Sequence, residues 1–134
     1  MKIEKACRTD AKKITTLTLR SKNYWNYGEQ QIAEWKDELT ISPNYIDANH
    51  VYQLINANEM VGFYAFQAES KTKVRLNFLF VDPQHIKKGY GKILMTDFLQ
   101  RIKKTKYKTV TLDADPNAEE FYKHFGFKVV GKLK

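Results

Sequence analysis

Apolar residues recur along this chain with two different periods, and the change from one to the other marks out the predicted elements. A period of three to four residues is typical of a helix with one buried face, and a period of two is typical of a strand. Helices are predicted over residues 9–21 and 29–39, around Leu94, Phe98 and Ile102, and over residues 116–126. Strands are predicted over residues 1–8, 50–58, 60–69, 73–82, 108–115 and 127–134.

The order of these elements is β-α-α-β-β-β-α-β-α-β, which predicts an α/β (α+β) fold. Residues 50–69 indicate an antiparallel hairpin that turns around Ala57, Asn58 and Glu59. The strand, helix and strand that follow residue 73 form a unit whose strands must be parallel. We therefore predict a mixed, mostly antiparallel sheet with helices on both faces. The almost wholly apolar stretch 76–81 should be covered on both sides.

Local preferences give further expectations for the first residues. Thr9 or Asp10 is the expected N-cap of the helix over residues 9–21, because short polar side chains accept hydrogen bonds from a helix start. Cys7 is the only cysteine, which excludes an internal disulfide and a cysteine-based metal cluster. We expect Cys7 to be buried in the first strand as a small apolar residue.

Length and composition predict a single domain. The chain has 134 residues, of which 43% are hydrophobic, and this supports one core but no second domain of comparable size. We therefore assign residues 1–134 to one domain. No run of about 18 apolar residues occurs, and residues 1–13 lack the apolar middle of a secretory signal. We expect a soluble cytoplasmic protein without a membrane span.

The formal net charge of +8 predicts attraction to an anion without identifying it. Nucleic acid, an anionic membrane surface and a phosphate-bearing cofactor would all satisfy this charge. Lys87, Lys88 and Lys92 gather around two glycines, and further lysines follow at positions 103, 104, 106 and 108. We interpret the second group as a solvated helix end, where cations complement the helix dipole.

Residues 81–92, VDPQHIKKGYGK, join a predicted strand to a helix and carry Gly89 and Gly91. Unpaired N–H groups and the dipole make a helix start attractive to anions. Glycines let a phosphate approach the amides of residues 87–92, although two glycines also serve close packing. The P-loop pattern is absent, and Leu94 stands where a dinucleotide fingerprint has its third glycine.

Two segments resemble the GNAT superfamily of N-acetyltransferases, in particular its small, single-domain bacterial members. Residues 78–99 are similar to the acetyl-CoA motif Gln/Arg-x-x-Gly-x-Gly/Ala, with Ile86 where Gln or Arg is usual. Residues 112–131 are similar to the closing motif of that family, and the matching residues are Asn117, Ala118, Phe121, Tyr122, Gly126 and Phe127. The predicted order of elements agrees with the same family.

The resemblance implies an enzyme that moves an acetyl group from acetyl-CoA directly to a primary amine. It places the pantetheine arm against the backbone of Leu79, Phe80 and Val81, with the Leu79 N–H facing the thioester carbonyl. The other implied cofactor-binding residues are Ile86, Lys87, Lys88, Gly89, Tyr90, Gly91, Lys92, Asn117 and Phe121. Tyr122 is the implied general acid, although its helical spacing from neighbouring apolar residues also fits plain core packing.

The general base stays open at this stage. We interpret His85 as a solvent-facing loop residue rather than as a base. Asp113 and Asp115 end a predicted strand near the expected cleft, but Asp115 before Pro116 also suits a helix cap. A chain of water molecules is a further alternative.

In the resembled family the loop between the first two helices selects the substrate. Here that loop carries Tyr24, Trp25 and Tyr27, which either wall a pocket for a cationic or planar amine or pin the two helices onto the sheet. The expected acceptor is a small-molecule or peptide amine, and a homodimer is compatible with this interpretation. Two other functions stay open: a basic nucleic-acid-binding module, for which no recognised motif occurs, and a non-catalytic acetyl-CoA sensor.

Overall fold

A computed structural model describes residues 1–24, 39–85, 88–112 and 119–127 of the chain. Its strands are β1 (Lys2–Lys5), β2 (His50–Asn56), β3 (Glu59–Ala68), β4 (Lys73–Val81) and β5 (Thr109–Thr111). Its helices are α1 (Ala11–Tyr24), α3 (Pro43–Ala48), α4 (Tyr90–Lys103) and α5 (Glu119–His124), with short 3₁₀ helices η1 (Arg8–Asp10) and η2 (Pro83–His85). The helix predicted over residues 29–39 and the last predicted strand lie almost wholly outside the described residues.

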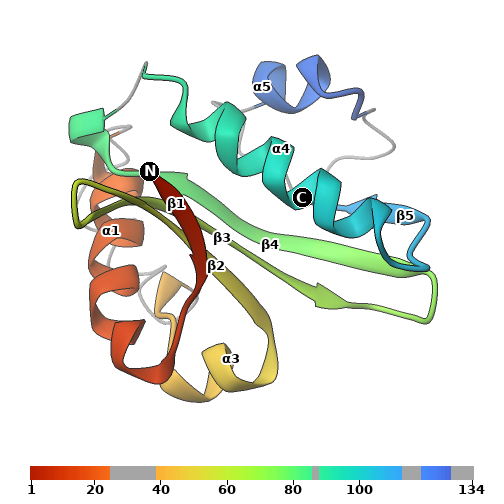
Figure 1. Cartoon of the computed structure of the whole chain (residues 1–134), viewed down its shortest axis with the longest axis horizontal. Coiled ribbons are helices and arrows are strands. Elements are labelled where there is room, and N and C mark those ends of the chain that lie inside the picture. The colour runs from red at the N-terminus through yellow and green to blue at the C-terminus, as the bar shows by residue number, and fades with distance from the viewer. Residues whose placement is uncertain (25–38, 86–87, 113–118, 128–134) are drawn as a thin grey trace.

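The five strands form one sheet in the order β1-β2-β3-β4-β5 (Figure 1). The first four strands pair antiparallel with their neighbours, and β4 pairs with β5 in parallel. This confirms the predicted mixed, mostly antiparallel sheet. The parallel pair is joined through α4, as a parallel connection requires a crossover.

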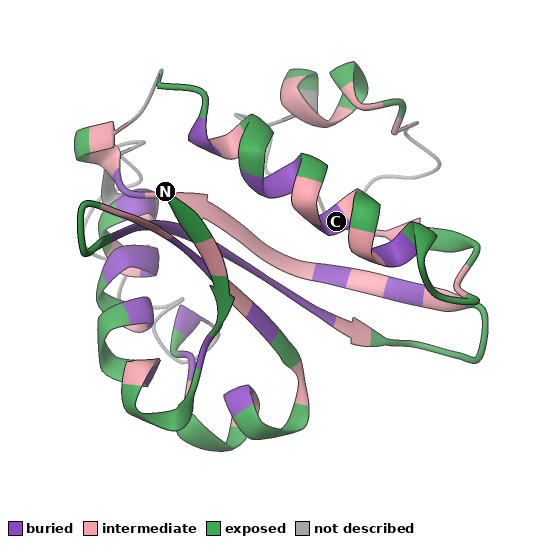
Figure 2. Cartoon of the chain, in the orientation of Figure 1, coloured by how far each residue is buried: buried purple, intermediate pink, exposed green. Residues whose placement is uncertain are grey.

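Helices cover both faces of the sheet, as the apolar patterns predict. Figure 1 shows α4 and α5 on one side, and α1 and α3 on the other. Leu94, Met95 and Phe98 of α4 are completely buried in the first core, and Ile14 and Leu17 of α1 are completely buried in the second. Figure 2 shows the resulting burial of β3 along most of its length. None of the helices in the described ranges combines the length and apolar character needed to cross a bilayer.

The hairpin between β2 and β3 turns where it was predicted. Ala57 and Asn58 both adopt the left-handed conformation, with φ of 53° and 65°. Two consecutive residues with positive φ are typical of a type I′ turn, whose twist matches that of the flanking strands. A β-carbon at Gly62 of β3 would lie 2.9 Å from Leu94 Cδ1, so the missing side chain lets α4 pack directly on the sheet.

The predictions for Cys7 and for the first helix cap are wrong. β1 ends at Lys5, and Cys7 is exposed at the N-cap of η1 instead of being buried in a strand. The Cys7 N–H donates to Asp10 Oδ2 at 2.9 Å, so Asp10 reaches back to the cap rather than serving as the N-cap itself. A carboxylate in this position satisfies a donor that the helix leaves unpaired. The 3₁₀ turn therefore occupies the residues expected to open the helix.

The short helix α3 was not predicted, although its start carries a readable signal. Ser42 is the N-cap, and its Oγ accepts a hydrogen bond from the Tyr45 N–H at 3.0 Å. Pro43 follows in the first turn, where its missing N–H costs nothing. The helix brings Tyr45 and Ile46 against the face of the sheet that α1 also covers.

Candidate functional site

The candidate site begins at an edge of β4 that β5 leaves. Pairing between these strands runs only from Lys73 with Thr109 to Arg75 with Thr111. Beyond Arg75, β4 continues to Val81 and pairs with β3 alone in the part of the chain that the structure describes. Among the described residues, no second strand pairs with this half of β4, which is the arrangement expected for a strand that binds an extended ligand arm.

The direction of each backbone group on this edge follows from one hydrogen bond. The Asp82 N–H donates to the Val61 carbonyl oxygen at 2.8 Å. Because backbone groups alternate along an antiparallel pair, the polar groups of Phe80 then face β3, whereas those of Leu79 and Val81 face the edge away from β3. The Val81 carbonyl oxygen accepts from Ser21 Oγ at 2.9 Å. The geometry thus favours Leu79 and the Val81 N–H for ligand contact and leaves Phe80 little backbone capacity.

The turn that follows β4 leads into a helix start that is open to an anion. Gly89 is the N-cap of α4, with φ 80°, and no side chain caps the helix. A β-carbon at Gly89 would meet nothing within 4 Å, so there is space beside this residue. The first N–H groups of a helix have no intrahelical partner, and α4 has no acidic residue in its first turn. Lys88 and Lys92 are exposed beside this space, while Ile86 and Lys87 lie outside the described residues.

Gly91 shows a second use for a small residue at this turn. A β-carbon there would lie 3.4 Å from Phe121 Cε1 and 3.8 Å from Val81 Cγ2. Gly91 therefore brings the start of α4 close to the end of β4 and to α5 at once. The structure in this way joins the two sequence segments that carried the resemblance. Close packing, one of the two roles considered for these glycines, is observed at Gly91.

The side chain of Tyr90 belongs to the core rather than to the open space. It is 8% exposed, and its hydroxyl oxygen accepts a hydrogen bond from Asn56 Nδ2 at 2.9 Å. This contact ties the first residue of α4 to the end of β2. Among the predicted cofactor residues, Tyr90 consequently offers a ligand only its backbone.

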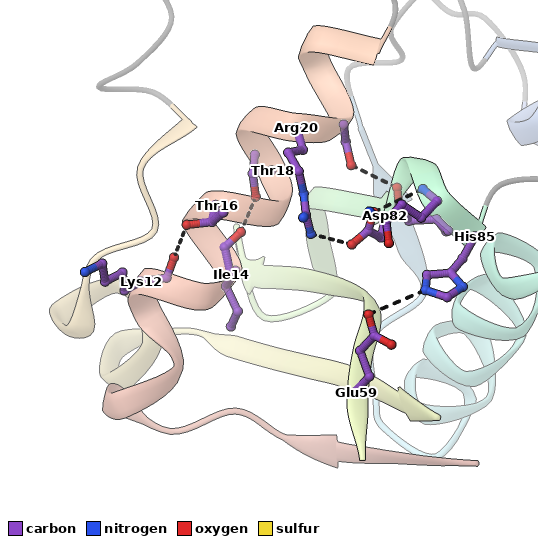
Figure 3. A network of polar contacts seen from close by, with 11 residues as sticks. Lys12, Ile14, Thr16, Thr18, Arg20, Glu59, Asp82 and His85 are labelled. Carbon is purple, nitrogen blue, oxygen red and sulfur yellow. Dashed lines mark hydrogen bonds and ion pairs between the residues drawn. The ribbon is translucent and has the colours of Figure 1, made fainter. Parts of the chain in front are cut away.

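A buried carboxylate that was not predicted from the sequence fixes the junction between β4 and the turn. Asp82 is 1% exposed and forms an ion pair with Arg20 of α1 (Figure 3). Its other oxygen, Oδ1, accepts from the Gln84 N–H at 3.1 Å. Together with the Ser21 contact to Val81, these bonds hold the end of β4 against α1. Arg20 and Ser21 thus position the strand end from which the turn departs.

Replacing Arg20 with methionine should destabilise the protein by leaving the Asp82 carboxylate buried without its cation. We expect the free energy of unfolding to fall by roughly 1–2 kcal/mol, less than for a fully buried pair, because water partly screens the half-exposed Arg20. Urea denaturation measures the loss. Lys13→Met on the same helix removes an exposed partner of Asp10 and should cost under about 0.5 kcal/mol. Equal losses in both variants would show that Asp82 does not depend on Arg20.

His85 does not face solvent as predicted. Its side chain is 17% exposed, and both ring nitrogens are buried without a hydrogen-bond partner among the described residues. Nε2 lies 3.7 Å from Glu59 Oε1, and the ring packs against Tyr90 with centroids 5.9 Å apart (Figure 3). The prediction failed because the hairpin turn, distant in sequence, folds over η2. His85 therefore packs between the hairpin and the start of α4.

The short helix α5 places Phe121 and Tyr122 beside the same core as Leu79 and Val81. Both aromatic side chains are half-buried. The Tyr122 ring packs edge-on against Phe121 at 5.3 Å and against Phe127 at 5.9 Å between centroids. Half-burial of a phenol at the rim of a core suits a group that presents its hydroxyl to a ligand, and it also suits simple packing.

Several predicted site residues cannot be placed. Asp113, Asp115 and Asn117 lie outside the described residues, as do Trp25 and Tyr27. Tyr24 ends α1, and its side chain is outside the description. Aromatic residues that the structure describes on the α1 side of the sheet include Tyr45, Phe63, Phe78 and Phe80. Phe78 and Phe80 belong to the apolar stretch 76–81 that the sequence pattern marked, and Tyr45 follows the aromatic loop residues that were considered for an acceptor pocket.

Comparison with known proteins points to one family. Residues 23–134 match the family described as "Acetyltransferase (GNAT) domain". The "Uncharacterized N-acetyltransferase ycf52" of Gracilaria tenuistipitata var. liui is 26% identical over 92 residues, which cover 69% of this chain and 50% of that protein. The chain thus spans about half the length of this curated relative.

Solved structures share the fold. The PaiA N-acetyltransferase of Thermoplasma acidophilum, in complex with coenzyme A, is 20% identical with a TM-score of 0.83, covering 96% of this chain and 91% of that one. A GNAT family acetyltransferase of Brucella melitensis, in complex with acetyl-CoA, is 23% identical with a TM-score of 0.71, covering 96% and 82%. Because the family match extends over most of its length, the chain belongs to the acetyltransferase (GNAT) domain family.

Proposed function

We propose that this protein transfers an acetyl group from acetyl-CoA directly to a primary amine. The observation that carries the proposal is the helix start at Gly89, which has no side-chain cap and lies beside the end of β4, beyond the residues of β4 that pair with β5. The helix start suits a diphosphate, and the part of β4 that does not pair with β5 suits the pantetheine arm that is attached to the diphosphate. The family match and the complexes of two relatives with coenzyme A or acetyl-CoA support the same ligand.

The residues at the helix start fit the diphosphate. The first N–H groups of α4 would donate to phosphate oxygens, and the dipole of this 14-residue helix adds positive potential. Lys88 and Lys92 would contribute longer-range attraction through exposed ammonium groups. This contact needs no side chain at position 86, so Ile86 in place of the usual Gln or Arg is compatible with binding.

Acetyl-CoA supplies an activated acetyl group as a thioester, and the protein has two tasks in its transfer. The Leu79 N–H, directed away from β3, would donate to the carbonyl oxygen as negative charge develops there. The Tyr122 hydroxyl would give its proton to the sulfur as the C–S bond breaks and the C–N bond forms. The acceptor amine must attack in its neutral form, and its excess proton leaves to solvent.

The acceptor in this proposal is a small-molecule or peptide amine, and the reaction takes place in the cytoplasm. The aromatic side chains of Tyr45, Phe78 and Phe80 lie on the α1 side of β4, across the sheet from α4.

Thermal denaturation with acetyl-CoA tests the binding step. A hundredfold excess over Kd stabilises a protein by about 2.7 kcal/mol, which we expect to raise Tm by about 10 °C. Release of free thiol from acetyl-CoA, followed with a panel of small amines and amine-terminated peptides, then tests turnover. Stabilisation without thiol release from any amine would indicate a sensor. Salt-sensitive binding of random oligonucleotides without a response to acetyl-CoA would contradict the proposal altogether.

A further inference from the structure

β4 contains a bulge whose position decides which backbone amide faces the cleft. On β3, Ala65 pairs with Phe78 and the next residue, Phe66, pairs with Leu76. Asn77 is therefore an extra residue without a partner on β3. A bulge of this kind bends its strand and changes the alternation beyond it.

The change of alternation is visible in the two cores. Before the bulge, Val74 and Leu76 point into the core under α4; after it, Leu79 and Val81 do so. The residues of β4 that point into this core are thus even-numbered before the bulge and odd-numbered after it. A one-residue shift also exchanges the backbone groups that face each neighbour. Without the bulge, Leu79 would direct its N–H into β3, and Phe80 would face the open edge instead.

The side chain of Asn77 is held by Tyr45 of the unpredicted helix α3. Asn77 Nδ2 donates to the Tyr45 hydroxyl oxygen at 2.8 Å. The Tyr45 ring packs edge-on against Phe78, the residue after the bulge, with centroids 5.9 Å apart. Burial raises the pKa of Tyr45, so its hydroxyl stays protonated at neutral pH. The contact thus braces both residues of the bulge from outside the sheet.

We propose that Tyr45 is a positioning residue that holds the Asn77 bulge and so aims the Leu79 N–H at the thioester carbonyl. This inference rests on the proposed function. It separates two tasks within the site, because Tyr45 lies on the α1 side of the sheet whereas the helix start that would hold the diphosphate belongs to α4. Loss of the brace should therefore weaken polarisation of the carbonyl without weakening cofactor binding.

Tyr45→Phe removes the hydroxyl and keeps the ring, and acetyl-CoA labelled with ¹³C at the carbonyl reports the result. In the unaltered protein, binding should shift the carbonyl stretching frequency downward, as expected for a carbonyl that accepts a hydrogen bond. In Tyr45→Phe we expect a smaller shift, a Kd for acetyl-CoA within about twofold, and thiol release slowed about tenfold, less than full loss of an oxyanion donor costs. Tyr52→Phe, which trims a half-buried tyrosine of the opposite core, is the matched control and should change none of these.

A second pair of variants separates positioning from folding. If Tyr45 acts through Asn77, then Asn77→Ala should slow thiol release as much as Tyr45→Phe, and the double variant no more than either. An unchanged carbonyl frequency in a folded Tyr45→Phe variant, or additive losses in the double variant, would overturn the inference. A lack of acetyl-CoA binding by the unaltered protein would instead defeat the proposed function, so the two failures are distinguishable.

Discussion

Replacing Gly89 with valine should remove most of the affinity of this protein for acetyl-CoA. The backbone at Gly89 has φ 80°, which a β-branched residue adopts only with strain, and the new side chain would fill the space beside residue 89 that the proposal gives to a phosphate. We expect at least two charge-assisted hydrogen bonds to phosphate to be lost, which raises Kd on the order of a hundredfold. Calorimetric titration with acetyl-CoA measures this directly.

Gly126 offers a matched control for the strain alone. It too adopts a positive φ, 92°, and a β-carbon there would also meet nothing within 4 Å. Gly126→Val should therefore lower stability to a similar extent, by about 1–2 kcal/mol, while acetyl-CoA still binds. A Gly89→Val protein that is folded and binds acetyl-CoA with unchanged Kd would remove the helix start from the site.

Tyr122→Phe should slow thiol release about a hundredfold and leave acetyl-CoA binding within about twofold, since positioned acids contribute 10²–10⁴ in rate. The phenyl ring preserves the contacts with Phe121 and Phe127, so the change is confined to the hydroxyl. Without this proton donor, the leaving thiolate must take its proton from water. Steady-state assays with the best amine of the panel, at saturating acetyl-CoA, separate kcat from KM.

Tyr107→Phe is the control for this second experiment. Tyr107 is a half-buried tyrosine that packs on the same core as Tyr122, at a place where no site residue is predicted. Its loss of a hydroxyl should leave turnover unchanged. Equal turnover in Tyr122→Phe and the unaltered protein would return Tyr122 to a packing role, the alternative that its helical spacing had left open.

Local patterns in the sequence predicted those features that depend on neighbouring residues. The face of α4 that carries Leu94, Phe98 and Ile102 is buried as its period requires. The hairpin at Ala57 and Asn58 also forms where its residues indicate. Helical and strand periods reflect burial over a few helical turns or residue pairs, so they can be recognised from the local sequence alone. The resemblance to the acetyl-CoA motif of the family further predicted that the helix start at Gly89 binds the cofactor.

Contacts between distant residues were decided only in the folded chain. Arg20 meets Asp82 across 62 positions, and Tyr45 meets Asn77 across 32. The prediction that His85 faces solvent failed for the same reason, because Glu59 belongs to a hairpin that folds against it.

The sequence by itself determined the order of the main described elements, the apolar face of α4 and the glycines at the start of that helix. The tertiary structure alone decided the bulge at Asn77, which turns the Leu79 N–H, already implied by the family resemblance, and not that of Phe80 away from β3. The physical reason is that an apolar run such as residues 76–81 has no alternation of its own to fix a register. Its register is set by pairing with β3 and by side chains that reach it from α1 and α3.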